Sequence, residues 1–324
     1  MRALSVSAFH DLIGARECVP VTTWLALSPK IVLPQRCQHM KQTLVALSLL
    51  FAVSLHAELP SAEKIYAVIQ DYLSRRPSPG YGVALRMEEA LIVQRAFVAG
   101  LEPDLGKPVG YKVGLVSRVA QERFHTTQPV RGVLLEKMLV PNDAEVPADF
   151  GTHMILEADL IVTVKDKGIH QATTHLEVLK HLKEVIAFIE LPDSLLSTNV
   201  PMDAAMLTAV NVGARLGVLG QRTPVKANRK FADALAAMRV SLSDETGAVL
   251  GKAQGLTILD HPLNAVLWLV EELNQAGITL KPGDMLSLGS MMMVSPVPAG
   301  KRITVQYDGL PGGLLKVSVR LKGR

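Results

Sequence analysis

The chain has 324 residues, of which 48% are hydrophobic, so it can bury a core in one large domain or two small ones, and wholesale disorder is excluded. The formal net charge is only +4 although the sequence pI is about 9.0. Residues 1–57 hold five Lys or Arg against two acids, so the remaining chain is almost neutral and gives no electrostatic reason to expect a nucleic-acid partner.

A secretory signal peptide is predicted at residues 40–57. Met40 and the basic Lys41 precede an uncharged apolar run over 43–55, and the small Ala57 is followed by a polar stretch. The run is shorter than the roughly 20 apolar residues that a membrane span needs. We therefore expect a periplasmic or secreted protein that no longer contacts the membrane after cleavage. A cytoplasmic location is the alternative if this segment is not a working signal.

Residues 1–39 are interpreted as a mis-assigned or disordered upstream extension, with Met40 as the true start; an ordered extension is the alternative. Both cysteines, Cys18 and Cys37, lie in this part of the sequence. The body after Ala57 has no cysteine, so its sequence offers no disulfide framework, thiolate nucleophile or cysteine-type zinc site.

A small helical N-terminal arm is predicted over residues 58–106. The stretch 61–76 has apolar residues at the helical period, 77–82 breaks the helix with Pro and Gly, and a second helical stretch follows at 83–100. After this arm the helical spacing of apolar residues is replaced by a different sequence pattern.

A mostly-β, mixed domain is predicted over residues 107–324, which makes the fold class α+β. Short apolar, β-branched runs alternate there with turns. One helix is expected at 262–276, beginning at Pro262 and stopping at Gly277, with His261 capping it or lining a pocket mouth. The main expected strands are 109–115, 154–164, 184–191, 210–219, 238–244 and 248–255, with three more near the C-terminus.

The stretch LEADLIVTV (156–164) carries two acids in an otherwise apolar strand. Alternate residues of a strand share a face, so Glu157 and Asp159 point the same way. Glu190 ends a second apolar run, just before Pro192. Like charges on such strands need a cation, a shared proton or basic partners. Three carboxylates suit Mg²⁺, Mn²⁺ or Ca²⁺, whereas a solvated face or a salt-bridged edge is the alternative interpretation.

A lysine lies inside another apolar strand, in GYKVGLVS (110–117). Lys112 could move a proton or hold an enolate or carboxylate, since a buried lysine is uncommon unless it is paired. The alternative is a lysine that makes a salt bridge or extends its ammonium group to water. The histidines after Ala57 form no zinc-binding motif.

These segments together resemble the 2-keto-4-pentenoate hydratases of the fumarylacetoacetate hydrolase superfamily, which also contains the oxalocrotonate decarboxylases. The segments are GYKVGLVS, LEADLIVTV, AFIELPDS, HPLNAVLWL and GDMLSLGS, and the resemblance covers roughly residues 60–322. It implies a fumarylacetoacetate-hydrolase-like catalytic domain, a Mg²⁺ or Mn²⁺ cofactor, a small 2-oxo acid substrate and a homo-oligomer.

The resemblance also implies roles for particular residues. Glu157, Asp159 and Glu190 would be the metal ligands, and Lys112 the catalytic residue that handles protons near the 2-oxygen of the substrate. The expected reaction is the addition of water to a 2-hydroxy-dienoate or 2-oxo-enoate. The predicted substrate-binding residues are Asn211, Gly289 and Ser290.

The chain also departs from the family pattern. Asp159 replaces a glutamate, and the family's N-A-S segment is Asn211-Val212-Gly213, without its hydroxyl. Leu288 stands for a threonine, Asp260 for a glycine, and the run Met291–Met293 for a more glycine-rich loop. A changed substrate therefore stays open. The alternatives are a 2-oxo acid decarboxylase, an acylpyruvate hydrolase and a non-catalytic periplasmic protein that binds an oxo acid.

Overall fold

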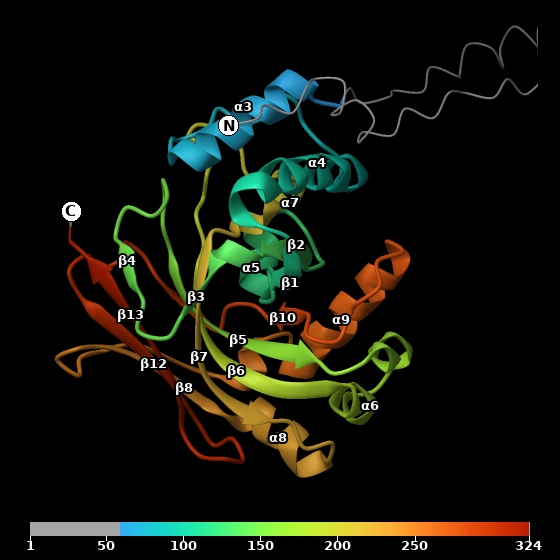
Figure 1. Cartoon of the computed structure of the whole chain (residues 1–324), viewed down its shortest axis with the longest axis vertical. Helices are drawn as coiled ribbons and strands as arrows, with labels where there is room; N and C mark the ends of the chain where they lie inside the picture. Colours follow the sequence, from blue (N-terminus) through green and yellow to red (C-terminus); the bar gives the residue numbers. More distant parts are fainter. Residues whose placement is uncertain (1–58, 324) are drawn as a thin grey trace, which may run out of the picture. The chain divides into compact units, whose positions relative to one another are not determined.

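The computed structural model describes residues 59–323, and the part from Pro60 onward forms one compact unit (Figure 1). Two sheets and several helices make up this unit, which confirms the predicted α+β class. The upstream extension and the signal peptide, predicted at 1–39 and 40–57, lie outside the described residues. Among the described residues, no helix combines the length and hydrophobicity needed to cross a membrane.

Two helices precede the sheets, as predicted. Helix α3 (Ala62–Ser74) begins where the Ser61 hydroxyl accepts a hydrogen bond from the Lys64 amide at 3.3 Å. Helix α4 (Met87–Leu105) begins later than expected, and α3, α4 and α7 (Ala204–Ala209) lie together above the sheets in Figure 1. The helices belong to the same compact unit as the sheets.

The larger sheet carries the acidic strands at its centre. Its strand order is β2-β1-β10-β5-β6-β7-β3, and β11 pairs with the other end of β5. The strands are β1 (Pro108–Gly114), β2 (Val130–Leu135), β3 (Leu139–Pro141), β5 (Leu156–Val164), β6 (Leu182–Leu191), β7 (Leu216–Pro224), β10 (Met285–Ser287) and β11 (Met292–Val294).

The smaller sheet has the order β4-β13-β12-β8-β9. The predicted hairpin through Glu245-Thr246-Gly247 is confirmed, because β8 and β9 pair antiparallel across it. The strands are β4 (Glu145–Pro147), β8 (Arg239–Asp244), β9 (Val249–Gln254), β12 (Arg302–Asp308) and β13 (Leu315–Lys322).

One predicted strand was wrong at its start. Residues Asn211–Gly213 form a helical turn rather than the beginning of the strand expected at 210–219. Asn211 and Val212 have φ of 58° and 53°, which a strand cannot adopt. The short helices α5 (Arg118–Arg123), α6 (His175–Lys180) and α8 (Arg229–Ala237) were not predicted.

The predicted helix at 262–276 is confirmed as α9 (Pro262–Gln275), with His261 as its N-cap. The Nδ1 atom of His261 accepts a hydrogen bond from the Leu263 amide at 3.0 Å, and its ring stacks on His175 at 4.0 Å. Burial and then His175 lower the pKa of His261, while the Ala232 carbonyl and Asp233 oppose them. The neutral imidazole is therefore the form that the fold prefers.

Acid is expected to destabilise the protein partly through this cap. Because the folded-state pKa of His261 is lowered, the unfolded chain binds the proton first, and stability is lost as pH falls below the ordinary histidine range. Asn caps a helix well but does not titrate there, so His261→Asn should flatten the loss of stability. Urea unfolding between about pH 7 and 5 measures it; equal slopes in both proteins would contradict the prediction.

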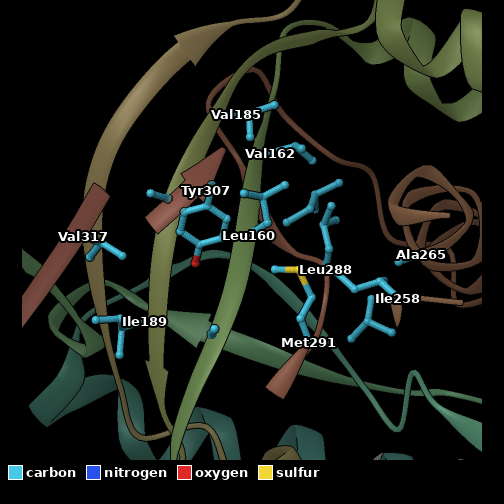
Figure 2. Packing of buried hydrophobic residues seen from close by; sticks show 14 of the residues in the cluster. Leu160, Val162, Val185, Ile189, Ile258, Ala265, Leu288, Met291, Tyr307 and Val317 are labelled. Carbon is cyan, nitrogen blue, oxygen red and sulfur yellow. The ribbon is translucent and has the colours of Figure 1, made fainter. Parts of the chain in front are cut away.

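The core fills the space between the two sheets and continues under α9. Leu160 and Val162 of β5, Ile189 of β6 and Val317 of β13 lie in one cluster (Figure 2). Tyr307 of β12 enters this cluster, and its hydroxyl donates hydrogen bonds to the carbonyls of Asp159 and Phe188. The smaller sheet is thereby tied to the acidic strands.

Removing that hydroxyl is expected to cost stability. In Tyr307→Phe, two buried carbonyls lose a donor, which predicts a loss of about 1–3 kcal/mol in the free energy of unfolding. Urea denaturation measures this quantity. Tyr66→Phe is the matched control, because the Tyr66 side chain is 57% exposed and should cost almost nothing. Equal effects of the two changes would contradict the prediction.

Candidate active site

Two acids face each other across β5 and β6. Glu157 lies directly opposite Glu190 in the antiparallel register, and both line a cavity of about 910 Å³. Leu156, Ala158 and Leu160 fill the opposite face of β5, as strand alternation predicted. Burial, followed by the charge of Glu190, raises the pKa of Glu157, while Lys112 opposes this shift. The pair therefore favours a positive partner.

Lys112 supplies positive charge to this pair. Its Nζ atom forms an ion pair with Glu190 Oε1 and donates a hydrogen bond to the Val212 carbonyl at 3.0 Å. The side chains of Lys112 and Glu190 are only 4% and 3% exposed. Gly132 of the neighbouring strand makes room, since a Cβ there would lie 2.9 Å from Lys112 Cγ. The lysine is thus a buried, paired residue of the cavity wall.

Asp159 lies on the same face of β5 as Glu157, but its carboxylate is held by hydrogen bonds from other residues of the same chain. Its Oδ1 accepts hydrogen bonds from the amides of Leu160 and Gly289, and its Oδ2 accepts one from the Ser287 hydroxyl. It does not line the cavity. Burial, then the charge of Glu190, raises its pKa.

The backbone explains why Asp159 differs from Glu157. Strand β5 pairs with β10 at Ile161 and beyond and with β11 at Ala158 and before, so the crossing segment 288–291 passes Asp159. The Gly289 amide on this segment uses the carboxylate as its acceptor. Within residues 59–323, no three His, Cys, Asp or Glu side chains converge well enough to hold an ion together.

The residues present fit a hard divalent cation through two acids. Glu190 Oε1 is buried, and in the described chain no donor meets it with hydrogen-bond geometry beyond the ion pair with Lys112. Glu157 faces it from the next strand with oxygen donors only. Mg²⁺ is commonly bound by one or two carboxylates while it keeps several waters, so Glu157 and Glu190 suffice for its direct protein ligands.

The predicted substrate-binding residues are only partly brought together. Ser290 lines the cavity and donates its hydroxyl to the Met292 carbonyl at 3.0 Å. Asn211 does not line it, because its side chain pairs with both backbone groups of Val133 on β2. Gly289 is likewise turned to Asp159. Asn211 and Gly289 therefore do not line this cavity, and their contacts hold the neighbouring strands together.

Several cavity residues were missed by the sequence analysis. Asp193 is 2% exposed, and its Oδ1 accepts hydrogen bonds from both the amide and hydroxyl of Thr152 and from the His153 amide. His153 also contacts the Ser194 carbonyl through Nδ1 at 2.9 Å. The polar residues Thr152 and His153 just before β5 were the available signal, but nothing local shows that they meet the end of β6.

Comparison with known sequences confirms the resemblance, although no family model matches the chain. It is 28% identical to 2-keto-4-pentenoate hydratase 1 of Dechloromonas aromatica (strain RCB) over 202 residues, which are 62% of this chain and 74% of that protein. It is also 28% identical to the 2-oxo-hept-4-ene-1,7-dioate hydratase of Escherichia coli, over 69% of this chain and 83% of that protein.

A solved structure shows the same fold. The 4-oxalocrotonate decarboxylase from Pseudomonas putida G7, complexed with magnesium and adipate, matches with a TM-score of 0.68 and 25% identity. The match covers 81% of this chain and 98% of the decarboxylase. The arrangement of sheets and helices described above is therefore shared with this decarboxylase.

Proposed function

Because this chain is a relative of the 2-keto-4-pentenoate hydratases with the fold of the fumarylacetoacetate hydrolase superfamily, we propose that it is a divalent-metal-dependent hydratase of a small 2-oxo acid. Water would add across the carbon–carbon double bond of a 2-hydroxy-dienoate in its 2-oxo form, with oxygen bonding to one carbon and the proton to the other. The observation that carries the proposal is that Glu157 and the buried Glu190 lie opposite each other, with the buried Lys112, in one cavity wall.

The roles follow from the contacts of each residue. Glu157 and Glu190 would hold Mg²⁺ or Mn²⁺, and Asp159 would support the crossing segment behind them. A bound ion would supply Lewis acidity that stabilises negative charge on the carboxylate and 2-oxygen of the substrate. Lys112 carries its ammonium group at the same wall, so it can donate a proton or a hydrogen bond at the 2-oxygen.

The test uses the full chain with Mg²⁺ or Mn²⁺ and 2-hydroxypenta-2,4-dienoate. Loss of the dienol absorbance and a product heavier by one water support the hydratase, and Lys112→Ala should abolish the turnover. Absorbance loss no faster than without protein would overturn the proposal. Metal-dependent thermal stabilisation by oxalate without turnover would instead identify a binding protein.

Decarboxylation is the second candidate, because the decarboxylase named above shares the fold over most of this chain. The same assay run with a 2-oxo-enedioate distinguishes the two reactions, since decarboxylation releases carbon dioxide and hydration does not. Carbon dioxide release at a rate above that of hydration would favour this candidate.

We also propose that the protein is exported, on the strength of the sequence pattern at 40–57. N-terminal sequencing of protein recovered from the periplasm or medium tests this, with a new terminus after Ala57 as the expected result. A retained Met1 on all of the protein would overturn it.

A further inference from the structure

We infer that the protein has a second ligand site, away from the acid pair, which binds a small monocarboxylate with an apolar body. The site is a cavity of about 340 Å³ between α4, β2 and α9. In the described part of the chain, it shares no lining residue with the cavity of Glu157 and Glu190. The inference therefore goes beyond the proposed function and does not depend on it.

The second cavity lies on the other face of the sheet from Lys112. In the register of β2 on β1, Gly132 lies opposite Lys112 and Arg131 lies opposite Val113. Directly opposed residues share a face and successive residues alternate, so the side chains of Arg131 and Lys112 point to opposite faces. A ligand on Arg131 therefore leaves the first cavity open.

Arg131 is a buried cation with donors to spare. Its side chain is 6% exposed, and its Nε atom donates to Glu272 Oε1 at 3.1 Å. A guanidinium has five N–H donors, and within residues 59–323 the two terminal nitrogens of Arg131 meet no acceptor with hydrogen-bond geometry. Buried donors are normally paired. A planar pair of N–H groups matches the two oxygens of a carboxylate, so this group is the expected ligand.

The position of Arg131 is fixed by its backbone. The Gln94 side-chain amide, on α4, donates to the carbonyls of Arg131 and Thr208 at 2.8 and 2.9 Å. Gln94 is only 1% exposed, and Thr208 lines the cavity. The base of the site is thus held by buried hydrogen bonds before any ligand arrives, which lowers the entropy cost of binding.

Apolar side chains surround the base of the cavity. Met87 and Leu91 lie four residues apart on one face of α4, and Trp268 lies across from them on α9. Pro129 adds to this wall at the start of β2. The volume is at the lower end of the roughly 300–1,000 Å³ typical of ligand pockets, so the wall suits a short apolar body.

Two acids of α9 limit the charge of the ligand. Glu272 is already paired with Arg131. Glu271 is exposed, so water and salt screen its charge, and Gln275 Nε2 donates to it at 3.4 Å. The buried charge with unused capacity is therefore the positive one. The two acids oppose a second negative charge on the ligand, which favours a monocarboxylate over a diacid.

The experiment follows the fluorescence of Trp268 in the full chain. The sequence has two tryptophans, so the variant Trp24→Phe makes Trp268 the only reporter. The probes are hexanoate, the neutral hexanamide and the cation hexylamine, all in a chelator. Hexanoate should change the fluorescence saturably and bind about tenfold more tightly than hexanamide. The same affinity is expected when Mg²⁺ and oxalate are added to fill the first cavity.

Two substitutions in this background locate the carboxylate. Arg131→Lys keeps the charge beside Glu272 but loses the planar fork, so it should weaken hexanoate binding about tenfold. Arg118→Lys is the matched control, because Arg118 also donates through Nε to a glutamate at 3.1 Å but is 91% exposed and outside both cavities. It should leave the affinity unchanged.

Four outcomes would overturn the inference. They are hexanoate binding no tighter than hexanamide or hexylamine, an affinity that Arg131→Lys leaves unchanged, loss of binding when Mg²⁺ and oxalate fill the first cavity, and no saturable response at all. The last result is also expected if a second copy of the chain covers the cavity. None of these measurements uses turnover, so the proposed function stands or falls separately.

Discussion

Lys112→Met is expected to destabilise the metal-free protein by about 3–5 kcal/mol and to lower turnover about 10²- to 10⁴-fold. The substitution leaves Glu190 buried without its ion pair and leaves Glu157 opposite an unneutralised acid. The fold then holds two acids opposite each other in the cavity wall without a basic partner. Chemical denaturation in a chelator measures the first effect, and the dienoate assay the second.

A divalent cation should restore much of the stability of Lys112→Met. Because an ion held by Glu157 and Glu190 supplies the missing positive charge, the variant should gain more unfolding free energy from Mg²⁺ than the original protein does. The double substitution Lys112→Met with Glu190→Leu is the control. It removes both charges, so it should be more stable than the single variant and gain little from Mg²⁺. A single variant as stable as the original in chelator would contradict the ion pair.

The second large effect concerns metal binding, which substitutions of the three acids are expected to weaken to different degrees. Glu157→Gln and Glu190→Gln should abolish measurable Mn²⁺ binding, since each would remove a direct carboxylate ligand. Asp159→Asn should weaken Mn²⁺ binding about 10- to 100-fold, the range typical of residues that support a ligand without touching the ion. Electron paramagnetic resonance of Mn²⁺ measures free and bound ion without relying on activity.

Asp159→Asn should also lower the free energy of unfolding more than Glu157→Gln or Glu190→Gln does. The carboxylate accepts from two backbone amides and from Ser287, and an amide side chain can satisfy these donors only in part, so we expect a loss of about 1–3 kcal/mol in unfolding free energy. Asp159→Glu is the informative control, because it restores the charge with a longer reach. If Asp159→Asn abolished Mn²⁺ binding as Glu157→Gln does, Asp159 would be a direct ligand.

The sequence predicted the elements well where the hydrophobic period was local and strong. Strand β5, strand β6 and helix α9 were predicted within two residues at each end. Short elements such as β3, β11 and α7 have too few residues to show a period, and tertiary pairing decides them. The turn at 211–213 was missed because Val210, Val212 and the apolar residues that follow resemble a strand.

The site was predicted in its parts. Strand alternation placed Glu157 and Asp159 on one face, and the open choice for Lys112 between a chemical role and a salt bridge included the ion pair that the structure shows. The sequence could not distinguish Glu157 from Asp159. The difference depends on Ser287 and Gly289, more than 120 residues further along, whose hydroxyl and amide groups donate to the Asp159 carboxylate.

The sequence by itself determined which side chains are available and which face of its strand each occupies, because side-chain direction alternates along any extended backbone. Only the tertiary structure decided which of those side chains meet. The register of β6 on β5 brought Glu190 to Glu157. The sheet also brought Lys112 of β1, which β10 separates from β5, to Glu190, and the segment that follows β10 binds the Asp159 carboxylate. Buried donors and acceptors must be paired within the fold, and that requirement, which no local pattern contains, assigned the acids their different places.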